Sequence, residues 1–131
     1  MDEIRVFVYG TLREGEPNHR IVRGRLLAPV ERAVTEPGWA LYDLGPYPAM
    51  AATSNGVGCV YGDLVVVDEA TLAVLDRFEG VDVGHYQRVA ISVHNADGDD
   101  CSAWAFVQDL RQVRGAPRLT PGDWTTHRLH V

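Results

Sequence analysis

The sequence predicts an α+β domain, in which a small, curved and mostly antiparallel β-sheet or barrel is flanked by one substantial helix. Short β-prone stretches, separated by turns that contain glycine or proline, clearly outnumber helical ones along the chain. The stretch from Asp68 to Gly80 combines helical periodicity with signals for both helix ends. A length of 131 residues suits one domain with a buried core, so residues 1–131 are expected to form a single domain.

The first half of the chain is expected to be extended, apart from a short helical turn at Pro17–Val22. Ile4–Tyr9 is an apolar run that ends at a glycine, which is typical of a strand. The stretch 58–67 is rich in β-branched and aromatic residues and predicts another strand. The other segments expected to be extended are Arg25–Val34, Trp39–Leu44 and Tyr47–Ala52.

A helix is predicted from Asp68 to Glu79. The Asp68 side chain can cap the free amides of the first turn, and Glu69 suits the positive end of the helix dipole. Gly80 is placed to end the helix after Glu79, which gives it a length of about three turns.

The second half is predicted to contain a β-hairpin. Gln87–Val93 alternates apolar and polar residues, Asn95–Asp100 is rich in turn-forming residues, and Ser102–Val107 forms the returning strand. In the tail that follows, Trp124 is expected to pack on the body of the domain.

The segment VFVYGTL, residues 6–12, is a candidate binding loop. An apolar strand runs into Gly10, after which backbone amides and the Thr11 hydroxyl can face an anionic or carbonyl group. The alternative is a plain turn, because glycine commonly ends a strand.

Glu79 is the candidate base. Leu72, Leu75 and Glu79 share one helix face, with Phe78 beside it, and that face is expected to be buried. Burial and the negative end of the helix dipole would both raise the pKa of Glu79, so that it could act as a base near neutral pH. The alternative is that Glu79 reaches water at the rim of the helix. Asp76 and Arg77 fall on other faces and are expected to be solvated.

Composition excludes several function classes. The chain has 12 basic and 18 acidic residues and a formal net charge of -6, which argues against nucleic acid or an anionic membrane as the main partner. Its apolar runs are too short to span a bilayer, and the acidic start is unlike a signal peptide, so a cytoplasmic location is expected. Cys59 and Cys101 match no metal spacing and are expected to be buried, reduced thiols in strands.

Several short motifs occur together in an order that is specific for one family. VFVYGTLREGEPNH, YPAM, YGDLVVVD, LDRFEG, HYQRV and PGDW follow one another over nearly the whole chain. In this combination the chain resembles the gamma-glutamylcyclotransferase-like proteins, especially the branch that acts on gamma-glutamylamines. The resemblance implies a compact β-barrel with flanking helices and a cavity lined by the YGTL loop.

The resemblance also implies a site. Tyr9, Gly10, Thr11 and Leu12 match the loop that holds the substrate, and Glu79 in LDRFEG matches the catalytic base. The implied reaction is intramolecular: the α-amino group of a gamma-glutamyl amide attacks the γ-carbonyl, which gives 5-oxoproline and a free amine or amino acid without cofactor or metal. The identity of the leaving group and the oligomeric state stay open. The segments Gly38–Met50 and Gly80–His85 are expected to line the subsite for the leaving group. The rival interpretation is a non-catalytic protein of the same fold that binds a small metabolite.

Other polar residues near the motifs have two interpretations each. Tyr86 is either a substrate contact or a packing residue, whereas Asn18 and His19 are expected to cap the short helix or shape the loop. An arginine cluster near the loop is either a solvated face or a device that steers an acidic substrate. The cluster consists of Arg13, Arg20, Arg23 and Arg25. His85, His94, His127 and His130 are interpreted as surface or packing residues.

Overall fold

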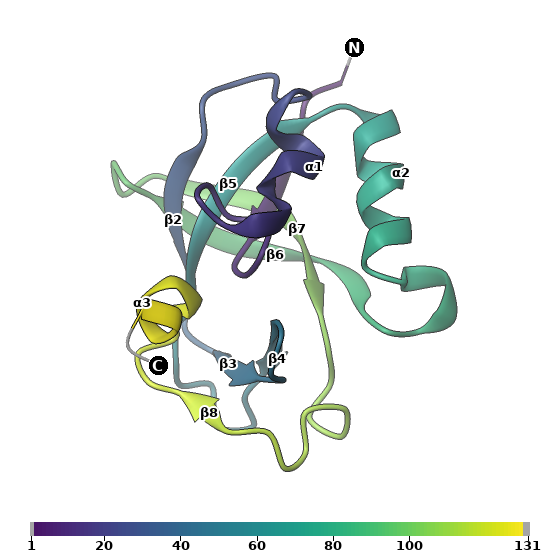
Figure 1. Ribbon diagram of the computed structural model, residues 1–131. Coiled ribbons are helices and arrows are strands. Elements are labelled where there is room, and N and C mark those ends of the chain that lie inside the picture. The colour runs from purple at the N-terminus through teal and green to yellow at the C-terminus, as the bar shows by residue number, and fades with distance from the viewer. Residues whose placement is uncertain (1, 130–131) are drawn as a thin grey trace.

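The computed structural model describes residues 2–129 and places a five-stranded barrel beside a small second sheet (Figure 1). The elements in chain order are β1 (Ile4–Val8), η1 (Pro17–His19), α1 (Arg20–Arg23), β2 (Glu31–Thr35), β3 (Trp39–Asp43), β4 (Pro48–Ala52), β5 (Tyr61–Val67), α2 (Glu69–Phe78), η2 (Val81–Val83), β6 (Gln87–Asn95), β7 (Asp100–Val107), β8 (Arg118–Leu119) and α3 (Trp124–Leu129).

The barrel closes in the strand order β1-β5-β2-β6-β7. Neighbouring strands are antiparallel except β1 and β7, which run parallel and meet through the pair Val6 and Trp104. The predicted α+β fold with a mostly antiparallel barrel is therefore confirmed. Inward side chains such as Phe7, Leu64 and Val93 are fully or almost fully buried and fill the interior.

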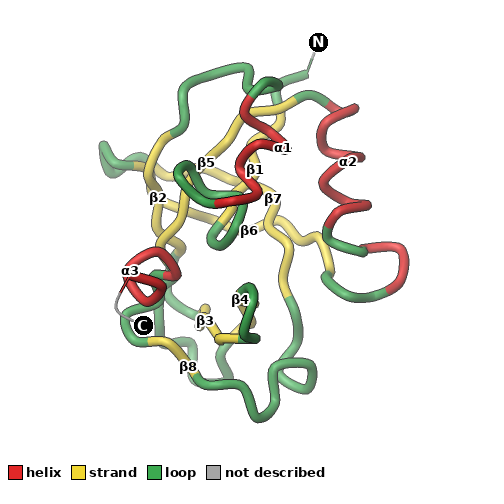
Figure 2. Tube along the Cα trace, viewed as in Figure 1, coloured by secondary structure: helices red, strands yellow, loops and turns green. Residues whose placement is uncertain are grey.

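The second sheet has the order β4-β3-β8 and lies at one end of the barrel (Figure 1). It joins the barrel through the backbone, because the amide of Gln108 donates to the carbonyl of Met50 at 3.0 Å. Figure 2 shows the helices on the outside of the strands. Helix α3 lies against the small sheet, where His127 Nε2 is 3.0 Å from Asp43 Oδ2.

Helix α2 forms as its sequence predicts. The Asp68 carboxylate accepts a hydrogen bond from the amide of Thr71 at 2.8 Å, which caps the first turn. Leu75 on the inner face is fully buried. Gly80 follows with φ 68°, a left-handed conformation that suits glycine and ends the helix at Glu79. These contacts fix Glu79 at the last turn, facing the end of the barrel.

Several boundaries differ from the prediction. Residues 25–30 form a loop, so β2 begins only at Glu31, and β5 begins at Tyr61 instead of Gly58. Cys59 therefore precedes a strand. Both it and Cys101, which does lie in β7, are free but half-buried, which corrects the expectation of buried thiols. In the tail, Trp124 is buried as predicted, but at the start of a helix.

Arg13 does not belong to a solvated face. It is 3% exposed, its Nε lies 3.4 Å from Asp63 Oδ1, and its Nη1 donates to Asp123 at 3.0 Å. The other oxygen of Asp63 accepts from the amide of Glu14 at 2.9 Å. Arg13 thus ties the segment after β1 to β5 and to the C-terminal segment, and it is not available to steer a substrate. Asp76 is also paired, because its carboxylate lies 2.8 Å from Arg88 Nε and is half-buried.

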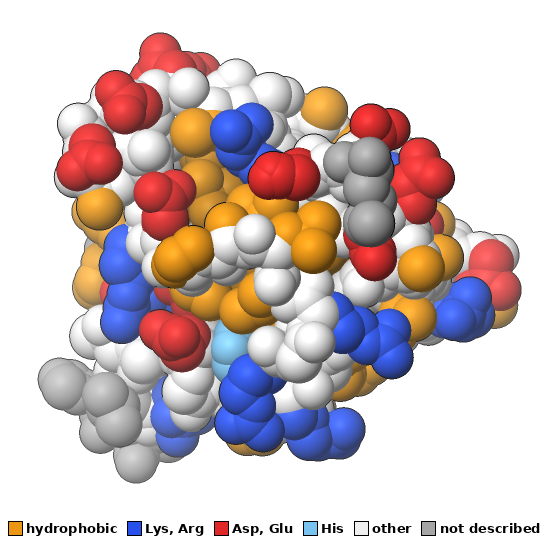
Figure 3. Space-filling model, turned by 90° about the horizontal axis from the view of Figure 1, so that it is seen from above, with side chains coloured by type: hydrophobic (Ala, Val, Ile, Leu, Met, Phe, Trp, Pro, Cys, Tyr) orange, Lys and Arg blue, Asp and Glu red, His pale blue; other side chains and the backbone are white. Residues whose placement is uncertain are grey.

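Arg20, Arg23 and Arg25 are exposed, as a solvated face requires. On the face shown in Figure 3, a band of hydrophobic side chains crosses the middle, with most acidic side chains in the upper half and most basic ones in the lower half. Among the described residues, no helix is long and apolar enough to cross a membrane.

Candidate active site

A pocket of about 290 Å³ opens where β1 ends, next to the last turn of α2 and the start of β4. Its walls also include Phe106 of β7 and the segment that leads into β6. All six residues that the sequence singled out line this one pocket. They are Tyr9, Gly10, Thr11, Leu12, Glu79 and Tyr86.

The loop at Gly10–Leu12 presents its amides and hides its carbonyls. The carbonyl oxygens accept hydrogen bonds in order from the amide of Arg13 at 3.1 Å, the amide of Asn18 at 2.9 Å and the ring of His19 at 3.0 Å. Within residues 2–129, no group accepts from the amides of Gly10, Thr11 or Leu12. Buried amides are normally paired, so three free ones beside a pocket are able to donate to an anionic or carbonyl oxygen.

Asn18 and His19 shape this loop. The amide group of Asn18 donates to Thr11 Oγ1 at 2.9 Å, and the buried His19 ring holds the carbonyl of Leu12. Because Thr11 Oγ1 accepts this bond, its own hydrogen stays available to a ligand. Neither residue donates or accepts a side-chain cap of η1 or α1. Asn18 also lines the pocket.

The two tyrosines form walls of the pocket with their hydroxyl groups already paired. Tyr9 donates to the carbonyl of Phe106 at 2.5 Å and accepts from the amide of Met50 at 3.1 Å. Tyr86 donates to the carbonyl of Pro48 at 2.8 Å. Burial raises the pKa of both hydroxyls above their ordinary value, so both stay protonated. A ligand would therefore meet their rings.

Glu79 is half-buried at the C-terminal end of α2. Its negative charge helps to raise the pKa of both Tyr9 and Tyr86. Burial raises its pKa from 4.5 to about 7. A carboxyl group with such a pKa can take up and return a proton near neutral pH. The lining contains no arginine among the described residues, and the chain has no lysine, so no permanently charged cation lies beside this carboxylate within the pocket.

The two segments expected to line the subsite for the leaving group, Gly38–Met50 and Gly80–His85, do contribute residues to the pocket, whereas Phe78 was not singled out as a lining residue from the sequence. Tyr47, Phe78 and His85 also border the pocket. His85 is exposed, as expected, but its Nε2 lies 3.3 Å from the Tyr47 hydroxyl and its ring packs edge-on against Tyr86 at 4.8 Å.

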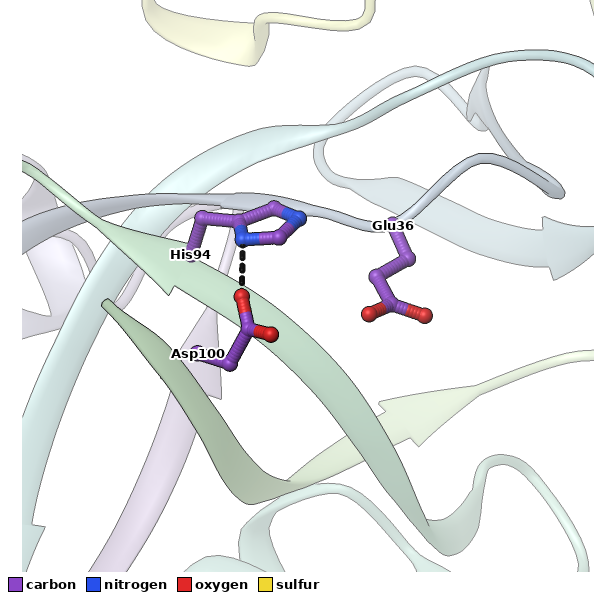
Figure 4. A group of neighbouring side chains, drawn as sticks. All are labelled: Glu36, His94 and Asp100. Carbon is purple, nitrogen blue, oxygen red and sulfur yellow. Dashed lines mark ion pairs between the residues drawn. The ribbon is translucent and has the colours of Figure 1, made fainter. Parts of the chain in front are cut away.

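A second group of polar side chains lies outside the pocket, on β6, β7 and the residue after β2 (Figure 4). His94 Nδ1 is 2.5 Å from Asp100 Oδ1, its cross-strand partner, and Glu36 approaches them with its carboxylate. One ligand atom from each lies within 4.8 Å of the others. Glu36 and Asp100 are exposed, as His94 partly is, and exposed acidic groups are common in proteins without a bound metal ion. His130 lies outside the described residues.

Comparison with known proteins decides the family. The family model for gamma-glutamyl cyclotransferases of the AIG2-like type matches residues 6–126, which include every element of the pocket. The chain belongs to this family. The recognised resemblance is thereby confirmed, and the protein is an enzyme of the gamma-glutamylcyclotransferase type.

Relatives within the gamma-glutamylcyclotransferase family cover most of the chain. It is 40% identical over 121 residues to a putative gamma-glutamylcyclotransferase of Vibrio cholerae, with 91% of this chain and 93% of the relative covered. It is 37% identical over 112 residues to the gamma-glutamylaminecyclotransferase of Rattus norvegicus, covering 78% and 74%. The crystal structure of an AIG2-like protein from Mus musculus superposes with a TM-score of 0.78 at 28% identity, covering 95% and 89%.

The position of the Gly10–Leu12 loop can be tested with one methyl group. The φ of Gly10 is not positive, so an alanine fits its backbone, but a Cβ there would lie 2.7 Å from Pro48 Cγ and 2.8 Å from Pro48 Cδ. Gly10→Ala is expected to displace the loop and to lower the kcat/KM for release of 5-oxoproline at least about tenfold, because small displacements of positioning groups are costly. Gly24→Ala is the matched control, since nothing lies within 4 Å of its Cβ. Equal kcat/KM in both variants would contradict a role for the loop.

Proposed function

We propose that the protein cleaves a gamma-glutamyl amide into 5-oxoproline and a free amine or amino acid, with Glu79 as general base and then general acid. One observation carries the proposal. The carboxyl group whose pKa burial raises to about 7 lines the same pocket as the free amides of Gly10, Thr11 and Leu12. A proton acceptor and a set of donors for oxygen are what an acyl transfer needs in one place.

The reaction needs no second substrate. The α-amino nitrogen attacks the γ-carbonyl carbon, a carbon–nitrogen bond closes the five-membered ring, and the bond to the leaving nitrogen breaks. Ionised Glu79 takes a proton from the attacking nitrogen and delivers one to the departing nitrogen, so the enzyme ends in its starting state. Neither water, metal nor cofactor enters this balance.

The free amides support this reaction in one of two ways. They can hold the α-carboxylate of the substrate or the oxyanion that develops on the γ-carbonyl. In both cases the donors are backbone groups that the paired carbonyls of the loop hold in place. The rings of Tyr9 and Tyr86 limit the space around the glutamyl chain, which favours the folded conformation that cyclisation requires.

The proposed reaction is tested with a substrate whose nucleophile, the α-amino group, is blocked. A gamma-glutamyl amide with a free α-amino group is expected to give equal amounts of 5-oxoproline and amine. The same amide acetylated at the α-amino nitrogen is expected to release no amine, because cyclisation is then impossible. Both products are measured by chromatography. If the acetylated compound is cleaved as fast as the free one, water is the nucleophile and the protein acts as an amidohydrolase.

A further inference from the structure

The pocket has a buried floor and an exposed rim. Tyr9, Gly10 and Tyr86 on the floor are buried, whereas Phe78 and His85 on the rim are exposed. Under the proposed function, the free amides and Glu79 take the glutamyl group. The amine of the substrate then points toward the rim, where it departs.

One side of the rim is built from aromatic rings in a fixed arrangement. The His85 ring stands edge-on to Tyr86 at 4.8 Å and edge-on to Tyr47 at 5.9 Å. The backbone of His85 is anchored on both sides, because its amide donates to the carbonyl of Gly80 at 3.0 Å and its carbonyl accepts from Gln108 at 3.1 Å. The backbone that carries the imidazole is therefore held at the rim of the pocket.

The charge of the pocket is a second feature, besides the aromatic rim, that determines which leaving groups fit. Of the described residues that line the pocket, Glu79 alone carries a carboxylate, and no arginine balances it. A leaving group with a carboxylate next to its nitrogen would enter beside this negative charge, and neither an arginine nor a lysine lines the pocket to pair with it. An uncharged flat or apolar group would pack on the rings instead.

From these features, and resting on the proposed function, we propose that His85 and Tyr47 form the subsite for the leaving amine. This subsite selects gamma-glutamyl amides of amines that carry an aromatic ring and no carboxylate. His85 acts there as a specificity-determining residue through the face or edge of its ring. It takes no part in the proton transfer assigned to Glu79.

Three substrates separate the two criteria. Gamma-glutamyl phenethylamide carries a ring, gamma-glutamyl ethylamide lacks it, and gamma-glutamyl phenylalanine adds only a carboxylate to the first. The expected kcat/KM for the phenethylamide exceeds that for the ethylamide about two- to tenfold, the range that one aromatic contact supplies. It exceeds that for gamma-glutamyl phenylalanine at least about tenfold, because of the unpaired charge.

Variants then assign the preference to the ring of His85. His85→Ala keeps the Cβ and the anchored backbone, and it is expected to raise KM for the phenethylamide until the preference over the ethylamide is lost. His85→Phe is expected to retain the preference. His94→Ala changes a residue that does not line the pocket and is expected to match the wild type. Thermal unfolding verifies that each variant is folded.

The outcomes distinguish the inference from the function on which it rests. If none of the three substrates yields 5-oxoproline, both the proposed function and this inference fail. If the substrates are turned over without preference, or if His85→Ala lowers kcat/KM equally for the phenethylamide and the ethylamide, the leaving-group subsite is wrong and the cyclotransferase reaction stands.

Discussion

Replacement of Glu79 by glutamine is expected to lower the kcat/KM for 5-oxoproline release by about a hundredfold or more, the effect of removing a general base. The amide has nearly the same shape as the carboxyl group but cannot accept the proton of the attacking nitrogen. Steady-state assays with a gamma-glutamyl amide measure the loss. A variant that keeps most of the wild-type rate would remove Glu79 from the mechanism.

The pH dependence identifies the group that is lost. Burial raises the pKa of Glu79 to about 7, so the ionised form that acts as a base disappears as the pH falls through that value. The kcat/KM of the wild type is therefore expected to fall on the acid side with a midpoint near 7, well above the pKa of a free glutamate. The residual activity of Glu79→Gln is expected to lack this limb.

Urea unfolding tests whether the loss of activity in Glu79→Gln arises without a loss of stability. Because the pKa of Glu79 is higher in the folded state than in the unfolded state, folding favours its protonated form. The stability associated with this group is present at low pH and is lost as the pH rises toward and through 7. Glutamine has no charge to bury, so at pH 8 the variant is expected to unfold in urea at a midpoint no lower than that of the wild type.

Arg13→Met is expected to lower the free energy of unfolding by about 3–5 kcal/mol, because it leaves the buried carboxylate of Asp63 without its buried ion-pair partner. Asp63 is 1% exposed, and Arg13 Nε lies 3.4 Å from its Oδ1. Urea unfolding at neutral pH measures the effect.

The second arginine beside Asp63 supplies the control for this prediction. Arg32, whose Nε lies 3.9 Å from the same oxygen, is 69% exposed. Arg32→Met is expected to change the free energy of unfolding by no more than about 1 kcal/mol, as exposed pairs do. Equal losses in the two variants would show that burial of Arg13 carries no special stability.

Local signals were sufficient for the elements that hold the site. The cap by Asp68, the left-handed Gly80 and the apolar stripe ending at Glu79 all act within a few residues of one another. Because the residues that make these interactions are close together in the sequence, helix α2 and its candidate base could be predicted. The strands of the barrel likewise followed from β-prone segments and their turns.

Long-range pairing could not be predicted in the same way. Arg13 appears in the sequence as one of several arginines, and only its partners Asp63 and Asp123, distant along the chain, make it a buried residue. Strand β8 has two residues, too few for a periodic pattern. The rim residues Tyr47 and His85 lie 38 residues apart in the sequence, so their contact depends on the completed fold.

The parallel contact between β1 and β7 also has a consequence for the order in which the protein can assemble. β1 leaves the ribosome first, yet its neighbours in the closed barrel are β5 and β7, which are made much later. Non-local pairings of this kind must wait for the chain between them. The residues that line the pocket extend along the chain from Phe7 to Phe106, and the hydroxyl of Tyr9 donates a hydrogen bond to the carbonyl of Phe106. A nascent chain that ends before β7 can therefore contain the Gly10–Leu12 loop and Glu79 and still have no active site.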